Sequence, residues 1–499
     1  MRMLRSLLLG SAVGLIAVGG AQAADLPVKA KAVEYVKICS LYGAGFYYIP
    51  GTDTCIKFGG YLRADAVLGT NSDYGFAGGV TGARNRLSNY YTSRARMDFT
   101  VDTRTATEYG VVRTYADLVF TWTGGGYTGS SPSAYDSTGT NATVGGGQLG
   151  IYHAFIQFAG FTFGRTVSIF DAPWQSYPAG GPDTLPGGSN HVTGVNQVAY
   201  TADFGQGITG TVALQDPTQY DQANLWNLST ATAAGMITGA YGANDWGGTR
   251  APDLIGQVRV DQAWGLFQFS AAAHDMHAAY YGATEVTGHP DDKWGWAVQA
   301  AMSIKNIPTG AGDSINLQAV YTDGASRYNF QSLFPQNAAL YGGTGLAGAY
   351  QSIGLFGIAD GVFVAGSGIE TVKTWGIRGG YTHNWSPNWS SSIYGAYSQL
   401  KYGSNGAATI CANAALLIGF AGTCNPDFNL GVIGANVVWT PVKNLAFTAD
   451  LNWTRVDQKY SGTFSGAGTA VAGIAKPAAV YEAKDQNAVN MLLRAQRNF

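Results

Sequence analysis

The stretch LAFTADLNWTR at residues 445–455 alternates apolar and polar side chains. The apolar positions are Leu445, Phe447, Ala449, Leu451 and Trp453, and the polar ones are Thr448, Asp450, Asn452 and Thr454. A period of two places the two sets on opposite faces of a β-strand. A strand of about ten residues is long enough to cross a bilayer when it is tilted. The stretch therefore predicts a membrane-spanning strand with one face toward lipid and the other toward water.

Fifteen other segments repeat this pattern. In 93–105, for example, Met97 and Phe99 alternate with Arg96 and Asp98. Terminal boundaries of such segments are uncertain by about two to four residues. The sixteen expected strands span 56–69, 93–105, 109–122, 149–158, 161–168, 195–202, 207–215, 254–261, 264–274, 294–304, 313–322, 373–383, 388–398, 430–439, 445–455 and 488–499.

The connections between these segments alternate between short and long. Short turns are expected at 106–108, 159–160, 203–206, 262–263, 305–312, 384–387 and 441–444. Long loops are expected near 70–92, 123–148, 169–194, 216–253, 275–293, 323–372, 399–429 and 456–487. Bacterial outer-membrane barrels have this arrangement, with an even strand number, short periplasmic turns and long outer loops. We therefore expect an all-β fold, a 16-stranded antiparallel transmembrane β-barrel, whereas a soluble sandwich has no reason to place its long loops at one end.

One loop leaves the strand number open. The stretch 323–372 is long enough to contain two further strands, which would make the barrel eighteen-stranded. A closed barrel of either size removes the unpaired edges that hydrocarbon would penalise.

Composition supports an exported β protein. Glycine occurs 70 times, and charged residues make up 12% of the chain against an average of about 25%. Beyond the N-terminus there is no uninterrupted apolar run of about 18 residues, so the sequence predicts no transmembrane helix. A mean hydropathy of −0.01 fits strands that alternate between lipid and water.

The N-terminus has the layout of a secretory signal peptide. Arg2 and Arg5 precede a short apolar stretch, and Ala21-Gln22-Ala23 has the small-x-small pattern of a cleavage site. We expect 1–23 to be removed, which changes the formal charge from −2 to −4 because two arginines and no acid are lost. Residues 24–55 are expected to form a periplasmic leader, and 56–499 the barrel.

Four cysteines form two close pairs. In an exported protein an even count with local spacing favours disulfides, and we expect Cys39–Cys55 and Cys411–Cys424. A zinc site is the alternative, but CxxC spacing and nearby histidines are missing.

Aromatic residues cluster beside the short turns, where amphipathic rings suit the headgroup level. They are Phe158, Phe161, Trp264, Trp385, Trp389, Trp439 and Phe499. Ordinary core aromatics of a sandwich are the alternative. The terminal Phe499 follows a period-two strand, which resembles the C-terminal signal that the barrel-assembly machinery recognises, although Arg497 falls on the apolar face.

Further motifs resemble one family. Ala24-Asp25-Leu26-Pro27, Lys37-Ile38-Cys39, the run from Tyr42 to Cys55, and Gly59-Gly60-Tyr61-Leu62-Arg63 resemble the start of alphaproteobacterial outer-membrane general porins, and Phe163-Gly164-Arg165-Thr166 fits the same family. The resemblance implies a homotrimer, passive diffusion of small hydrophilic solutes, and a third loop folded into the channel.

On this topology residues 169–194 are the constriction loop. It carries Asp171, Asp183 and one basic candidate, His191. The polar faces of the early strands carry Arg63, Arg94, Arg96, Arg104 and Arg113. Acids on the loop facing arginines on the wall would order water and tune ion preference. Alternatively, the arginines pair with neighbours such as Asp65, Asp98 and Asp102.

The sequence also bears on the partners of the barrel and on chemistry other than transport. Outer-membrane lipid and lipopolysaccharide are expected to surround the barrel. Ala24 at the mature end resembles the terminus that some related barrels attach to peptidoglycan, and a flexible leader tethered by Cys39–Cys55 is the alternative. We find no GxSxG elbow, phosphate loop or basic run, so we expect no enzyme, cofactor, metal site or nucleic-acid partner. The densest metal-like cluster, His274-Asp275-Met276-His277, reads as a solvated loop.

A channel selective for sugars or anions is the main alternative to a pore for passive diffusion. A barrel enzyme and a soluble adhesin are more distant alternatives.

Overall fold

The computed structural model describes residues 37–69, 91–123, 148–174, 183, 185–189, 192–218, 220–331, 334–469 and 476–499. The expected signal peptide, residues 24–36 of the expected leader, and His191 lie outside the described residues.

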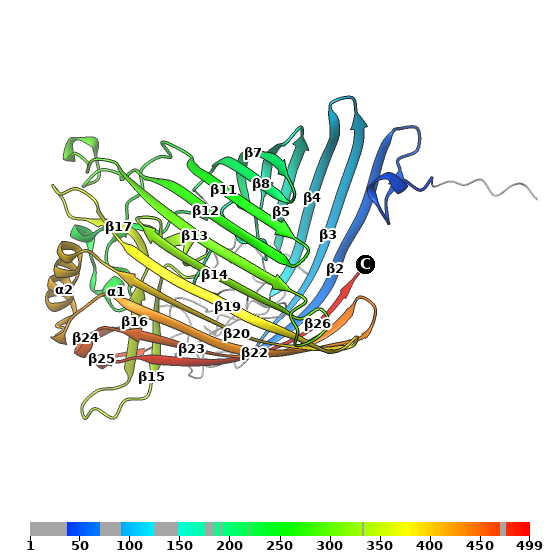
Figure 1. The fold of residues 1–499 in the computed structure, drawn as a ribbon. Helices are drawn as coiled ribbons and strands as arrows, with labels where there is room; N and C mark the ends of the chain where they lie inside the picture. The colour runs from blue at the N-terminus through cyan, green and yellow to red at the C-terminus, as the bar shows by residue number, and fades with distance from the viewer. Residues whose placement is uncertain are drawn as a thin grey trace, which may run out of the picture.

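Sixteen strands of the described chain form a closed antiparallel barrel (Figure 1). In order around the ring they are β2 (Thr54–Gly69), β3 (Tyr91–Thr107), β4 (Gly110–Thr123), β5 (Gln148–Phe158), β6 (Phe161–Thr166), β7 (Val195–Gly205), β8 (Ile208–Gln215), β11 (Asp253–Gln262), β12 (Gly265–Met276), β13 (Lys293–Lys305), β14 (Ser314–Asp323), β19 (Lys373–Ser386), β20 (Trp389–Lys401), β22 (Phe428–Val442), β23 (Leu445–Gln458) and β26 (Gln486–Asn498). Each strand pairs with the next, and β26 pairs with β2 to close the ring. The sixteen-stranded expectation is confirmed.

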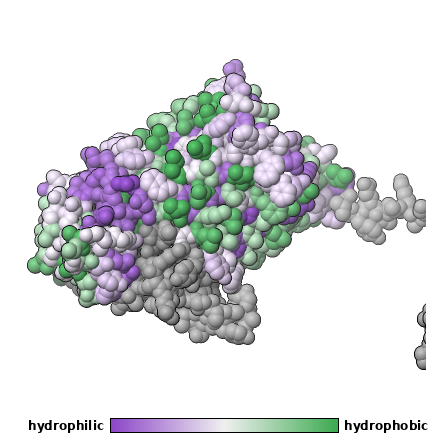
Figure 2. Space-filling view, turned by 90° about the horizontal axis from the view of Figure 1, so that it is seen from below, coloured by the Kyte–Doolittle hydropathy of each residue, from purple (hydrophilic) through white to green (hydrophobic). Residues whose placement is uncertain are grey.

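The barrel is apolar outside and polar inside. On β23, Phe447, Leu451 and Trp453 are exposed on the outer face, while Asp450 and Asn452 between them are buried toward the lumen. Figure 2 shows hydrophobic residues spread over the flank of the barrel and hydrophilic residues gathered toward the long-loop end. Lipid replaces water around the flank, so apolar side chains are stable there.

The short turns lie at one end of the barrel. Among the residues that the structure describes, four non-glycine residues have positive φ, and each lies in one of these turns: Ala159, Gln206, Asn306 and Asn444. Tight hairpin turns need positive φ at their centre, since their twist then matches that of the strands. The short hairpin turns therefore limit the backbone conformations available at this end of the barrel. The other end carries the long loops.

The long loops build two further sheets. One contains β10 (Ala243–Asn244), β9 (Asn224–Asn227), β17 (Ala359–Phe363) and β18 (Glu370–Thr371); the other contains β15 (Asn337–Gly342), β16 (Ser352–Gly357), β25 (Lys476–Ala483), β24 (Ser461–Thr469) and β21 (Ala421–Thr423). The strands within 323–372 therefore join loop sheets rather than the barrel, and the eighteen-stranded alternative is wrong.

Helices of the described chain are short, and all except η1, which precedes the barrel, lie in the long loops. They are α1 (Ala233–Met236), α2 (Ser404–Ile418) and the 3-10 turns η1 (Ser40–Tyr42), η2 (Leu228–Thr230), η3 (Glu285–Thr287) and η4 (Ser326–Tyr328). Together with the loop sheets, η2, α1 and α2 enclose an apolar core that contains Trp226, Tyr241 and Phe356. Among the described residues, no helix has both the length and the apolar character needed to cross a bilayer.

Both expected disulfides are present. Cys39–Cys55 joins the residues before β1 (Tyr47–Tyr48) to the start of β2, and encloses a small core around Phe46. Cys411–Cys424 joins α2 to the end of β21.

Candidate functional site

The described residues of the third long loop, which connects β6 and β7 over 167–194, lie in the lumen. We call it loop 3. Amide side chains on the inner face of the barrel hold its first part: Gln257 Nε2 donates to Ile169 O at 2.6 Å, Gln268 Nε2 to Asp171 O at 2.8 Å, and Gln299 Nε2 to Phe170 O at 2.8 Å. These donors lie on β11, β12 and β13, so loop 3 leaves β6 and runs along another part of the wall.

A later part of loop 3, residues 185–189, is bound to β19. Arg378 Nη2 donates to Ser189 O at 2.8 Å and Arg378 Nη1 to Leu185 O at 3.4 Å. Gly187 has a φ of +91°, and a Cβ there would lie 2.6 Å from Ile377 O. Only glycine combines this backbone conformation with so close an approach to the wall.

Loop 6, residues 324–372 between β14 and β19, also enters the lumen. Its η4 turn is buried, and the Tyr328 ring lies 4.5 Å from that of Phe170 in loop 3, centroid to centroid. Backbone amides of Gly187 and Gly188 each donate to Asn329 O at 3.1 Å. Loop 6 therefore packs against loop 3 and holds it in place through these contacts.

The histidines of the 274–277 segment belong to two separate polar networks. His274 Nδ1 lies 2.8 Å from Asp253 and Nε2 lies 3.6 Å from Asp360, all fully buried. His277 pairs with Asp292 at 2.6 Å. In the part of the chain that the structure describes, no group of three or more His, Cys, Asp or Glu side chains is placed to hold a metal ion.

Asp183 of loop 3 reaches the wall on the opposite side of the lumen. Its Oδ2 lies 2.5 Å from Arg94 Nη1 on β3, and Arg494 Nη2 on β26 lies 3.8 Å from its Oδ1. Between these arginines, Asp65 on β2 accepts from Arg94 Nη2 at 2.6 Å and from Arg494 Nε at 2.7 Å. Burial alone raises the pKa of the Asp183 carboxyl, but Arg94 outweighs burial and lowers that pKa to about 2.

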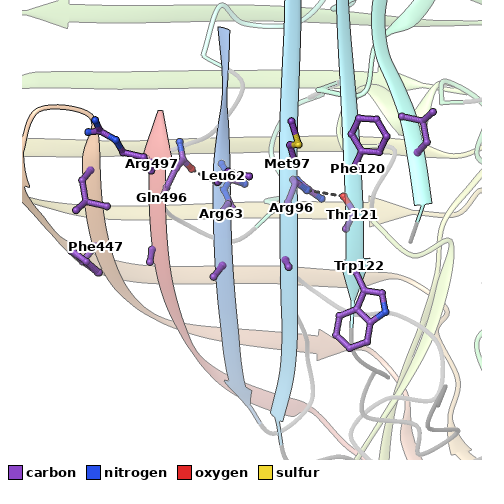
Figure 3. Close-up of a pocket in the computed structure, with 15 residues that line it drawn as sticks. Leu62, Arg63, Arg96, Met97, Phe120, Thr121, Trp122, Phe447, Gln496 and Arg497 are labelled. Atoms are coloured by element: carbon purple, nitrogen blue, oxygen red, sulfur yellow. Dashed lines mark hydrogen bonds between the residues drawn. The ribbon is translucent and has the colours of Figure 1, made fainter. Parts of the chain in front are cut away.

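A second row of side chains crosses the same strands. Arg63 on β2 and Arg96 on β3 are direct cross-strand partners. Arg63 Nε donates to Gln496 Oε1 at 2.8 Å, and Arg96 Nε donates to Thr121 Oγ1 at 3.0 Å. Figure 3 shows Gln496, Arg63, Arg96 and Thr121 in a line across β26, β2, β3 and β4. We call Arg63, Arg94, Arg96 and Arg494 the arginine wall.

The other expected arginines lie elsewhere. Arg104 and Arg113 each pair with Asp102 at 3.0 Å, as the neighbour-pairing alternative expected. Arg104 is ten residues from Arg94 on β3, about 33 Å along an extended strand, and lies 4.9 Å from the Phe46 ring. The structure therefore does not bring this pair together with Asp183.

Asp171 lies at the far side of loop 3. Its carboxylate is buried and accepts a hydrogen bond from the Ser189 hydroxyl, and its backbone oxygen accepts one from Gln268 on β12. Sequence reasoning did not place Arg494 in the site, and it named Asp65 only as a neighbour for the arginines to pair with, which Arg94 does. Both carried a signal, since each lies on the polar face of its strand, but their contact depends on barrel closure between β2 and β26.

Comparison with known proteins decides the family. A family model described as "Porin subfamily" matches residues 25–492. The chain belongs to this porin family. It is 29% identical over 347 residues to porin Omp2b of Brucella suis biovar 1 (strain 1330), which is 64% of this chain and 85% of that one. Porin Omp2b of Brucella abortus (strain 2308) matches with the same identity and coverage.

Solved structures support the fold of this porin. The outer membrane channel DcaP of Acinetobacter baumannii aligns with a TM-score of 0.57 at 17% identity, covering 91% of this chain and 99% of that one. The porin therefore spans the outer membrane and forms a channel for passive diffusion, as expected from the sequence. Its Brucella relatives are named as porins and not as enzymes.

Proposed function

We propose that small hydrophilic solutes are screened where loop 3 meets the arginine wall. The observation that carries this proposal is the contact between Asp183 and Arg94, because it takes loop 3 across the lumen to β3. Beside that contact, water and solutes would pass along Arg63 and Arg96. Charges of opposite sign on the loop and the wall order water and disfavour apolar solutes.

Single-channel conductance and zero-current potential in a salt gradient test this proposal. Asp183→Asn removes the loop charge that faces the wall, so we expect a changed conductance and a potential shifted toward anions. Asp203→Asn is the matched control, because Asp203 is exposed near the short-turn end of β7 and its removal changes the lumen charge equally. Equal conductance and equal zero-current potential for wild type and Asp183→Asn would mean that the channel is narrowest somewhere other than between loop 3 and the arginine wall.

We also propose that the porin is a homotrimer that packs through the outer face of β26, β2, β3 and β4. A hollow of about 650 Å³ lies there, floored by alanines and rimmed by Met97 and Phe120 on one side and Phe447 on the other (Figure 3). The alanines are Ala64, Ala95 and Ala495. Small residues allow membrane proteins to approach closely, so the hollow fits side chains of a second barrel.

Filling the hollow tests the trimer. Ala95→Trp should release monomeric barrels that still show heat-modifiable migration, as measured by native mass spectrometry and unheated gels. Ala300→Trp on the outer face of β13 is the matched control and should remain trimeric. Trimers from both variants would mean that the hollow holds lipid chains instead.

Two proposals concern the ends of the chain. Phe499 is exposed, and its backbone amide donates to Gly60 O at 3.1 Å, so its ring is available to the barrel-assembly machinery. Deleting Phe499 should slow assembly in cells without changing the conductance of refolded protein. Ala24, outside the described residues, is proposed for attachment to peptidoglycan; full release of the porin from cell walls by detergent alone would exclude this.

A further inference from the structure

Two arginines face each other in the lumen without an acid between them. Arg63 and Arg96 are direct cross-strand partners on β2 and β3. In an antiparallel pair such positions place Cβ atoms about 5 Å apart, and like charges there destabilise the sheet. We propose that Arg63 and Arg96 together form a binding subsite for small oxyanions, meaning solutes that carry a carboxylate or phosphate group.

The row above them is already neutralised. Asp65 and Asp183 are both shared between Arg94 and Arg494, so two carboxylates face two guanidiniums. Asp65 is therefore committed to its own row.

The row below them contains acids, but in the described part of the chain these form no ion pair with Arg63 or Arg96. Asp98 is the next inward-facing acid on β3, and its carboxyl is hydrogen-bonded to that of Asp117. Asp117 also faces His153 at 3.1 Å. Among the described residues, no carboxylate oxygen lies within 4 Å of an Arg63 or Arg96 side-chain nitrogen, so neither guanidinium forms an ion pair.

The side-chain geometry leaves donors for a solute. Neutral acceptors occupy only the Nε atoms, Gln496 for Arg63 and Thr121 for Arg96. The Arg63 guanidinium also stacks 4.4 Å from the Tyr61 ring centroid, which fixes its plane. Planar guanidinium groups bind carboxylate and phosphate oxygens through paired hydrogen bonds, and two of them facing one space match one oxyanion.

This subsite rests on the proposed function, since Arg63 and Arg96 meet solutes only if solutes pass between loop 3 and the arginine wall. Both arginines are only half-buried, so water remains in contact with the subsite. Its affinity is then weak enough for release, as conduction through a binding site requires. A phosphate ion would occupy the subsite transiently and reduce the chloride current in a saturable way.

The test is block of chloride current by inorganic phosphate across planar bilayers, with glucose as the neutral probe. We expect saturable block by phosphate and none by glucose. In Arg63→Gln/Arg96→Gln the half-blocking phosphate concentration should rise about tenfold or more, the loss expected for charge-assisted bonds. Arg63→Lys/Arg96→Lys keeps the charge without the paired donors and should give an intermediate value.

Controls separate this inference from the proposed narrowing. Arg259→Gln on β11 removes one lumen charge on a distant wall, where Arg259 pairs with Asp261 at 2.7 Å, and should block like wild type. Heat-modifiable migration confirms that each variant is folded. Unchanged phosphate block in the double glutamine variant, or block equal for phosphate and glucose, would overturn the subsite even if Asp183→Asn alters conductance. Unaltered conductance in Asp183→Asn would instead remove the narrowing.

Discussion

Replacing Arg378 by glutamine should loosen loop 3 without unfolding the barrel. Arg378 is 2% exposed and holds two loop carbonyls, Ser189 O at 2.8 Å and Leu185 O at 3.4 Å. A hydrogen bond to a charged donor contributes about 1.5–3 kcal/mol, and the longer bond contributes less. Water in the lumen replaces part of this stabilisation when the side chain is removed, so the two Arg378 hydrogen bonds together contribute about 2 kcal/mol. Their loss changes the ratio of attached to detached residues 185–189 by about 30-fold.

The assay is the current noise of single channels at constant voltage. Arg378→Gln should show more frequent fluctuations than wild type, while its unfolding transition in urea stays close to wild type because the backbone ladders of β19 with β14 and β20 are intact. Arg259→Gln serves as the control for loss of one lumen charge. Identical dwell times in Arg378→Gln and wild type would refute the reasoning, since loop 3 would then be held without this side chain.

Three further predictions concern loop 3 and the loop sheets. Gly187→Ala should displace loop 3 and change conductance, because its Cβ would meet Ile377 O, whereas Gly366→Ala has a similar φ of +83° with no atom within 4 Å and should conduct like wild type. Reduction of Cys411–Cys424 removes a 13-residue constraint of about 3 kcal/mol, so limited proteolysis should cut loop 7 (402–427) sooner while the barrel remains heat-modifiable. The folded-state pKa of Asp183 is about 2, below the usual value of about 4, so its contact with Arg94 should be present above about pH 4 and lost as the pH falls through about 2; the difference in conductance between wild type and Asp183→Asn should disappear over that range.

The barrel was accessible from sequence because its determinants are local. Alternation at 445–455 reflects lipid on one side and water on the other, and the β23 strand that results, Leu445–Gln458, begins at the predicted residue. Turn length is also local, since two-residue connections such as Asn444 with its neighbour admit few conformations. Both disulfides join cysteines that are 16 and 13 residues apart, so their pairing needed no long-range information.

The site was only partly accessible, because it joins residues far apart in the chain. Polar faces identified Arg63, Arg94 and Arg96 as lumen residues, yet periodicity assigns Arg104 to the same face and carries no information on height along the pore. Height follows from register: Asp65 is opposite Arg94 on one side and Arg494 on the other, which holds only once β26 has closed against β2.

The sequence by itself determined the two ends of the barrel and the disulfides and narrowed the strand number to sixteen or eighteen, since each depends on period, turn length or spacing along a short stretch. Tertiary structure alone decided that Asp183 meets Arg94, that Asp171 does not share its position, and that 323–372 builds loop sheets instead of barrel strands. These outcomes depend on which surfaces meet after closure. Loop 3 is fixed by contacts such as Arg378 with Ser189, 189 residues apart, and no local pattern encodes a contact between such distant residues.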